Sequence, residues 1–195
     1  MSQPPALPAA GESRERLQRT THAAHARLNR HPLLADITRP TYGVADYRCV
    51  LLAYHAAYRV IESWIRLCLP ALTPSFDYTG RWKLDWLVQD LAHFALLPAG
   101  EPGVPPAPPG EASDILGVLY VVEGSTLGGR VISSSLGRSL GLSADTGMRF
   151  FSAYGERSEA FWNTLTAYLN RHLDNDRAIA GASRAALATF ELVES

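Results

Sequence analysis

The sequence predicts an all-α, single-domain protein, and three observations lead to this prediction. Its 195 residues are the length of one domain, and an apolar fraction of 47% is enough for a full core. Apolar residues recur at helical spacing in separate stretches along the chain. No segment shows the period-two alternation bounded by turn residues that is typical of strands. We therefore expect six or more helices packed as a non-repeating bundle.

The first half of the chain predicts three helices after a mobile tail. Residues 1–12 are rich in proline, alanine and glycine, which is typical of a mobile terminus. Ser13 is the expected N-cap of a helix over 13–30. A second helix is expected over 41–69 and a third over 80–97, because each of these segments carries an apolar stripe at helical spacing.

The second half predicts a long glycine-containing helix and three further helices. Residues 98–113 are proline-dense without an apolar pattern, so we expect an exposed loop there. Ser113 or Asp114 is expected to cap the glycine-containing helix, 114–138, which ends before a glycine-bounded break. The remaining helices are expected at 150–155, 156–173 and 176–193.

Composition and charge exclude several classes of protein. The net charge of −1 is unlike that of a general nucleic-acid binder, which is usually basic. No run of 18 apolar residues lacks glycine or charge, and no secretory signal is visible, so we expect no membrane-spanning helix. Cys49 and Cys68 lack metal-ligand spacing, and we expect them to be buried, reduced thiols in a cytoplasmic protein.

The glycines of the long helix need a physical reason, because each interior glycine costs about 1 kcal/mol relative to alanine. At 100° per residue, Gly117, Gly124 and Gly128 fall on nearly one face. That bare backbone suits a flat ligand or a helix bend, and tight packing against a neighbouring helix is the alternative. The spacing alone leaves both interpretations open.

Histidine is the other candidate for chemistry, since the usual hydrolase, phosphate-binding and zinc motifs are absent. A di-iron centre would need Glu-x-x-His pairs, and Glu62 and Glu123 lie on separate helices without one. A single imidazole can hold haem iron, and His25 lies on the inward stripe of the first helix. A satisfied core histidine is the alternative, and His22 is the main rival ligand.

Together, a histidine helix and a bare-backbone helix would enclose a flat, iron-containing macrocycle. Its propionates would need basic or hydroxyl partners at the open rim. Three arginines at the start of the first helix lie in the right region: Arg14, Arg16 and Arg19. A solvated charged face is the alternative for these arginines.

Two motifs resemble those of bacterial heme oxygenases. The run LYVVEGSTLGGRVI at 119–132 resembles the distal-helix signature of that family. The proximal-helix pattern, whose histidine ligates haem iron, is similar to the spacing of Leu17, Thr21, His25 and Leu28. The resemblance covers residues 17–173 and looks closest to the branch found beside bacterial phytochromes.

The resemblance implies a fold and an activity. The fold is an all-α bundle over 13–195 that holds haem between the proximal and distal helices. The activity is oxidation of haem b, which is both substrate and cofactor, by O2 and electrons to biliverdin, CO and ferrous iron. An external donor such as a ferredoxin or a small reductant would supply the electrons, and a bacteriophytochrome would be a candidate recipient of biliverdin.

The resemblance also assigns residues on the proximal side. His25 becomes the axial ligand of the haem iron, with Thr21 beside it in the proximal pattern. Tyr120 matches a tyrosine that reaches a propionate in bacterial relatives. Gln18 stands where relatives often present a lysine, so propionate binding is expected to rest on Tyr120 with Arg19 or its neighbour Arg16.

On the distal side, Gly124 and Gly128 become the contacts to the ring, with Gly129 supporting the helix bend. Ser125 stands where some relatives carry an acidic side chain, and with Gly124 and Gly128 it forms the expected catalytic set.

Two alternatives to a heme oxygenase stay open: a haem carrier or sensor that does not degrade haem, and a helical partner-binding domain without a cofactor.

Overall fold

The structure is a computed structural model that describes residues 12–98 and 107–195. Over these ranges it contains seven α-helices and three short 3-10 helices and no strand, which confirms the all-α prediction. The α-helices are α1 (Glu12–Leu28), α2 (Val44–Cys68), α3 (Leu84–His93), α4 (Ile115–Leu140), α5 (Arg149–Ser152), α6 (Ser158–His172) and α7 (Asp176–Glu194).

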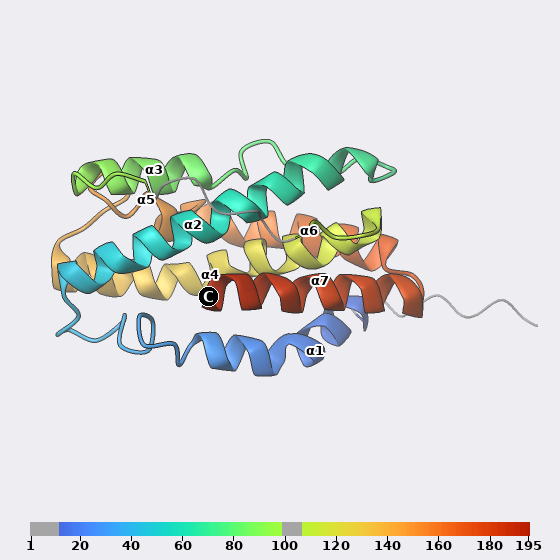
Figure 1. Ribbon diagram of the computed structural model, residues 1–195, viewed down its shortest axis with the longest axis horizontal. Helices are drawn as coiled ribbons and strands as arrows, with labels where there is room; N and C mark the ends of the chain where they lie inside the picture. The colour runs from blue at the N-terminus through green and yellow to red at the C-terminus, as the bar shows by residue number, and fades with distance from the viewer. Residues whose placement is uncertain (1–11, 99–106) are drawn as a thin grey trace, which may run out of the picture.

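The centre of the bundle is α4, which packs against α2, α5, α6 and α7. Figure 1 shows α7 lying alongside α1, and α7 packs against both α1 and α4. Several core side chains of α4 and α2 are fully buried, among them Leu116, Leu119, Leu51 and Ile65. Because α1 and α4 share α7 as a neighbour, α7 forms a common wall between them.

The segment 112–140 is long enough and apolar enough to cross a bilayer, with a mean hydropathy of 1.4 over its most apolar window. From the sequence we expected no such helix, because glycine or charge interrupts every apolar run. More than half of that window is buried inside the protein. These features are those of the core helix of a bundle, where an apolar surface is covered by neighbouring helices.

The start of α1 differs from the prediction. Glu12 already belongs to the helix, so Ser13 is not its N-cap. The Ser13 hydroxyl is buried and donates a hydrogen bond to the carbonyl of Leu173, at 2.7 Å, which connects α1 to the end of α6. The remaining residues of the expected tail, 1–11, lie outside the described part of the chain.

The third helix is shorter than predicted, because a side chain from another helix defines its start. The buried carboxylate of Glu62 in α2 accepts hydrogen bonds from the backbone N–H groups of Lys83, at 2.6 Å, and Leu84, at 2.8 Å. These N–H groups have no partner within the helix, so Glu62 satisfies them as a cap would. A cap supplied by a distant residue leaves no local sequence pattern.

The expected loop at 98–113 is described only in part, since residues 99–106 lie outside the described ranges. Ala112–Asp114 form a short 3-10 helix. Asp114 occupies the N-cap position of α4, as one of the two predicted residues, but its side chain accepts a hydrogen bond from the backbone of Glu111 and makes no capping bond to α4. The predicted break after α4 is confirmed, with Gly141 in the left-handed region at φ 69°.

The two cysteines are free thiols, as predicted, but neither is buried. Cys49 is exposed on α2, and Cys68 is partly exposed at its end. The periodicity of α2 places Cys49 next to the buried Val50 but on the solvent side.

At Gly117, near the start of α4, the lack of a side chain serves tight packing against a neighbouring helix, which was one of the two interpretations left open by the sequence. A Cβ at this position would overlap the carbonyl oxygen of Ala182 in α7 and lie 2.9 Å from the amide nitrogen of Ala186. The absence of a side chain therefore allows α4 and α7 to pack with their backbones in contact.

We expect Gly117→Ala to lower the free energy of unfolding by about 3 kcal/mol, because α7 must move away to admit the methyl group. Urea denaturation monitored by circular dichroism measures this change. An unchanged midpoint would contradict the close approach of α4 and α7.

Candidate functional site

A cavity of about 420 Å³ is lined by α1 and α4, with further side chains from α2, α5, α6 and α7. This volume is typical of sites that hold a small molecule or cofactor. Most of the predicted site residues line it: Thr21, His25, Tyr120, Gly124, Ser125, Gly128 and Gly129. The structure therefore brings the predicted proximal and distal residues to one cavity.

On the α1 side, His25 is exposed to the cavity and is not a core histidine. Its ring packs edge-on against Phe190 of α7, with centroids 6.0 Å apart. The side-chain nitrogen of Asn29 lies 3.5 Å from Nδ1 of His25, at the limit of a hydrogen bond. Nε2 is the ring nitrogen without this contact, and it could bind a metal in the tautomer that carries its proton on Nδ1.

The other histidines are less suited to hold a ligand in the cavity. His22 also lines it and is exposed one turn earlier in α1. His31 accepts a hydrogen bond at Nδ1 from the backbone of Leu33, and His55 is buried and does not line the cavity. Geometry therefore leaves His25 and His22 as candidates and favours His25, which has ring and side-chain neighbours that fix its orientation.

The cationic rim differs from the prediction. Arg19 is exposed and does not line the cavity, and Arg16 pairs with Asp176 at 2.7 Å. Arg14 and Gln18 line the cavity instead, because they share the stripe of α1 that includes His25. Arg19 lies about 100° from Gln18 around the helix, which turns it away from that stripe.

Tyr120 of α4 reaches across to α1. Its hydroxyl is hydrogen-bonded to Thr21, and burial raises its pKa, with that hydrogen bond and the positive charge of Arg14 opposing the shift. The Thr21 hydroxyl donates to the carbonyl of Leu17 at 2.7 Å, so its oxygen is available as an acceptor. Tyr120, Thr21 and Arg14 thus form a polar group at one edge of an otherwise largely apolar cavity.

The glycines on the α4 side have two different functions. A Cβ at Gly128 would meet no atom of the described residues outside its own helical turn within 4 Å, and a Cβ at Gly124 would lie 3.5 Å from the ring of Trp162. These two glycines present bare backbone to the cavity. Gly129 also lines the cavity, but a Cβ there would lie 2.8 Å from the carbonyl oxygen of Phe151. The lack of a side chain at Gly129 therefore allows α4 to pack closely against α5.

Ser125 is coupled to a buried tyrosine that the sequence analysis did not assign to the site. Its hydroxyl donates to the carbonyl of Val122 at 2.8 Å, and it is also hydrogen-bonded to the hydroxyl of Tyr58. Burial holds the pKa of Tyr58 well above its usual range, so this phenol stays protonated.

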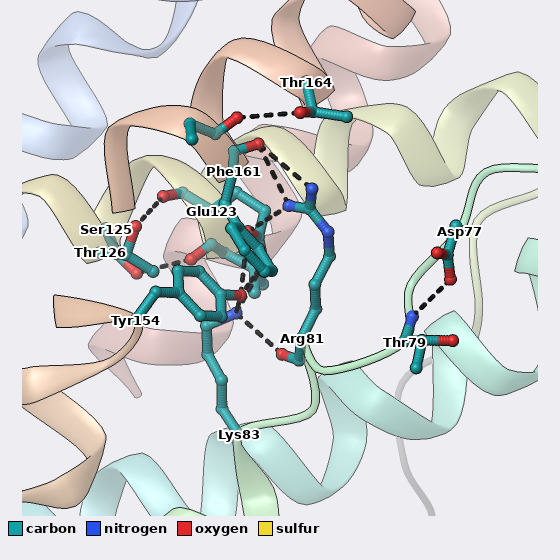
Figure 2. Close-up of polar contacts among 12 residues, drawn as sticks. Asp77, Thr79, Arg81, Lys83, Glu123, Ser125, Thr126, Tyr154, Phe161 and Thr164 are labelled. Carbon is teal, nitrogen blue, oxygen red and sulfur yellow. Dashed lines mark hydrogen bonds and ion pairs between the residues drawn. The ribbon is translucent and has the colours of Figure 1, made fainter. Parts of the chain in front are cut away.

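A buried polar cluster lies behind the glycines of α4. It consists of three charged side chains and one phenol: Glu123, Arg81, Lys83 and Tyr154 (Figure 2). We call these four residues the Glu123 cluster. Within the described ranges no three His, Cys, Asp or Glu side chains are placed to hold a metal ion. From the sequence, Glu123 was a candidate only for a metal site, because its partners Arg81 and Lys83 lie about forty residues away and leave no local motif.

Comparison with solved structures identifies the fold. Heme oxygenase from Leptospira interrogans superposes with a TM-score of 0.76 at 16% identity, covering 93% of this chain and 96% of that one. The chain has the heme oxygenase fold. The NO- and CO-bound heme oxygenase from Neisseria meningitidis matches with a TM-score of 0.74 at 21% identity, covering 93% and 87%. Heme oxygenase-1 from the cyanobacterium Synechocystis, in complex with heme, matches with a TM-score of 0.68 at 13% identity, covering 93% and 89%.

The sequence comparison is consistent with this fold. Residues 104–195 match the family model described as heme oxygenase, which includes all of α4 to α7. None of the curated proteins matches the chain. The matched region contains the distal glycines and Ser125, while His25 lies outside it.

Proposed function

We propose that this chain is a heme oxygenase, which degrades haem with O2 and electrons to biliverdin, CO and ferrous iron. One observation carries the proposal: His25 of α1 and the bare backbone of Gly124 and Gly128 in α4 line the same cavity. The fold and the family match of residues 104–195 support it.

The geometry of the cavity supports haem as its ligand. A Cβ at Gly128 would meet no described atom outside its own helical turn within 4 Å, so a flat ring can approach the backbone there. Haem, when bound, supplies the iron that binds and activates O2. His25 would hold this iron through Nε2, provided that Nδ1 carries the proton and Asn29 presents its amide oxygen to it. Arg14 with Tyr120 would pair with the propionates at the polar edge.

The distal side would control protons through hydroxyl groups. Ser125 lines the cavity beside the two bare glycines, and its side chain is hydrogen-bonded to the buried Tyr58. The Ser125 hydroxyl could donate a hydrogen bond into the cavity, and Tyr58 behind it stays protonated because burial raises its pKa. Neither hydroxyl is a strong acid, so this side would offer hydrogen-bonding groups without placing a carboxylate next to the ring.

We expect Ser125→Ala to slow turnover by about tenfold to a hundredfold while hemin binding stays unchanged, because the variant removes the hydroxyl that faces the cavity and is hydrogen-bonded to Tyr58. Tyr58→Phe, which keeps Ser125, is expected to slow turnover less. Single-turnover absorbance measurements compare the variants. Unchanged turnover and oxy-complex lifetime in Ser125→Ala would remove this residue from the catalytic set.

The remaining partners are part of the same proposal. A ferredoxin or a small reductant would supply electrons, and biliverdin would pass to a bacteriophytochrome if the chain belongs to that branch of the family. The two free thiols suit a reducing compartment, which supports a cytoplasmic location.

The experiment that tests the function is haem turnover. Purified protein is loaded with hemin and given O2 with ascorbate or reduced ferredoxin, and the Soret band is followed. Bleaching with appearance of biliverdin absorption is the expected result. A stable Soret band would indicate a haem carrier or sensor, and failure to bind hemin would indicate a helical domain without a cofactor.

A further inference from the structure

The carboxylate of Glu123 is completely buried one residue before Gly124, and it is held by three side chains. Arg81 Nη1 lies 2.7 Å from Oε2, and Lys83 Nζ lies 2.6 Å from Oε1. The Tyr154 hydroxyl lies 2.9 Å and 3.0 Å from the two carboxylate oxygens and also accepts a hydrogen bond from Lys83 at 2.8 Å. Figure 2 shows these side chains converging on Glu123.

Stability alone is a weak reason for such a cluster. Burying charges costs free energy that their attraction only partly returns, and apolar side chains of similar volume often stabilise a core as well. Hydrogen bonds and ion pairs differ from apolar contacts in that they fix direction and distance. The Glu123 cluster therefore fixes the position of α4 relative to the segment 81–83 and to Tyr154, which precedes α6.

The backbone of α4 needs an external anchor at this point. Gly124 has a low helix propensity. The hydroxyls of Ser125 and Thr126 donate to the carbonyls of Val122 and Glu123, at 2.8 Å and 2.7 Å, and such bonds within a helix favour bending. A bend at Gly124 would change the distance between the bare face of α4 and His25.

We propose that the Glu123 cluster consists of positioning residues, which hold the Gly124–Gly128 face of α4 at a fixed distance and angle across the cavity from α1. Lys83 itself lines that cavity, so the cluster reaches its wall. On the proposed function, this position decides which edge of bound haem lies closest to the distal backbone. Disturbing the cluster would therefore change the regiochemistry of ring opening as well as the mobility of α4.

Tyr154→Phe tests the proposal most cleanly, because it removes one hydroxyl and keeps the charges of Arg81, Lys83 and Glu123. It also keeps the ring, which stacks on Phe161 with centroids 4.2 Å apart. Tyr168→Phe is the matched control: Tyr168 is a buried tyrosine of α6 whose hydroxyl donates to the carbonyl of Pro74, and it does not line the cavity.

Hydrogen exchange of the amides of residues 124–128 is measured in haem-free protein. We expect exchange to rise about tenfold in Tyr154→Phe and to stay unchanged in Tyr168→Phe, with similar falls in Tm for both. Equal exchange in the two variants would overturn the positioning role. This comparison needs no haem, so it stays decisive even if the wild type fails to bind hemin and the proposed function is lost.

The second measurement is the ratio of biliverdin isomers formed by hemin-loaded protein. We expect the ratio to change in Tyr154→Phe and to match the wild type in Tyr168→Phe. A wild-type ratio in a Tyr154→Phe protein with raised exchange would overturn the link between the Glu123 cluster and regiochemistry.

Discussion

Replacing His25 with alanine is expected to abolish the spectrum of histidine-ligated haem and to weaken hemin binding by more than about a hundredfold. Removing a partner of a metal ligand typically costs ten- to a hundredfold in affinity, and removing the ligand itself should cost more. His25 is exposed to the cavity, so the substitution removes little buried contact and the protein should remain folded. Hemin titration followed by absorbance measures both effects.

His22→Ala is the matched control for this prediction. His22 lies on the same helix, is also exposed and lines the same cavity. We expect the variant to keep the wild-type spectrum and affinity within about threefold, since it loses no bond to iron. The reverse pattern, with the spectrum lost only in His22→Ala, would move the axial ligand to His22.

Replacing Gly128 with leucine is expected to make the protein more stable and a much poorer haem binder. An added side chain meets no described atom outside its own helical turn within 4 Å, and leucine is a better helix former than glycine. The free energy of unfolding should therefore rise by about 0.5 to 1 kcal/mol. The same side chain would occupy the space of the ring, so hemin binding should fall or the product isomer should change.

Two further variants separate the effect on haem binding in the cavity from the effect on the stability of α4. Gly128→Ala is expected to bring the same gain in stability with a smaller loss of haem binding, because its side chain is shorter. Arg130→Leu places a leucine on an exposed position of α4 that does not line the cavity, and it should bind hemin as the wild type does. Unchanged product at unchanged rate in Gly128→Leu would contradict a contact between Gly128 and haem.

The fold could be predicted where local patterns determine it. The bounds of α2, α4 and α7 lie within three residues of the predicted ones, because each helix carries a continuous apolar stripe and ends at glycine, proline or a polar cap. The prediction was wrong where a distant residue decides the structure. Glu62 sets the start of α3, and Leu173 engages the hydroxyl of Ser13 that was expected to cap α1.

The site, like the fold, could be predicted where the pattern within one helix determines it. Helical spacing and family resemblance placed His25, Gly124 and Gly128 at one cavity, because each lies on a single face of its own helix. Arg19, which was expected beside a propionate, does not line the cavity, since its neighbour Gln18 lies on the stripe of α1 that does. The partners of Glu123 were missed because a contact between residues forty positions apart depends on how the helices pack.

The central claim is that haem is bound between His25 and the bare backbone of α4, and a crystal structure of the hemin complex tests it most directly. We expect iron bonded to Nε2 of His25, with the opposite face of the ring against Gly124 and Gly128. Haem bound through a different residue, or with a distal face that does not touch those two glycines, would contradict it.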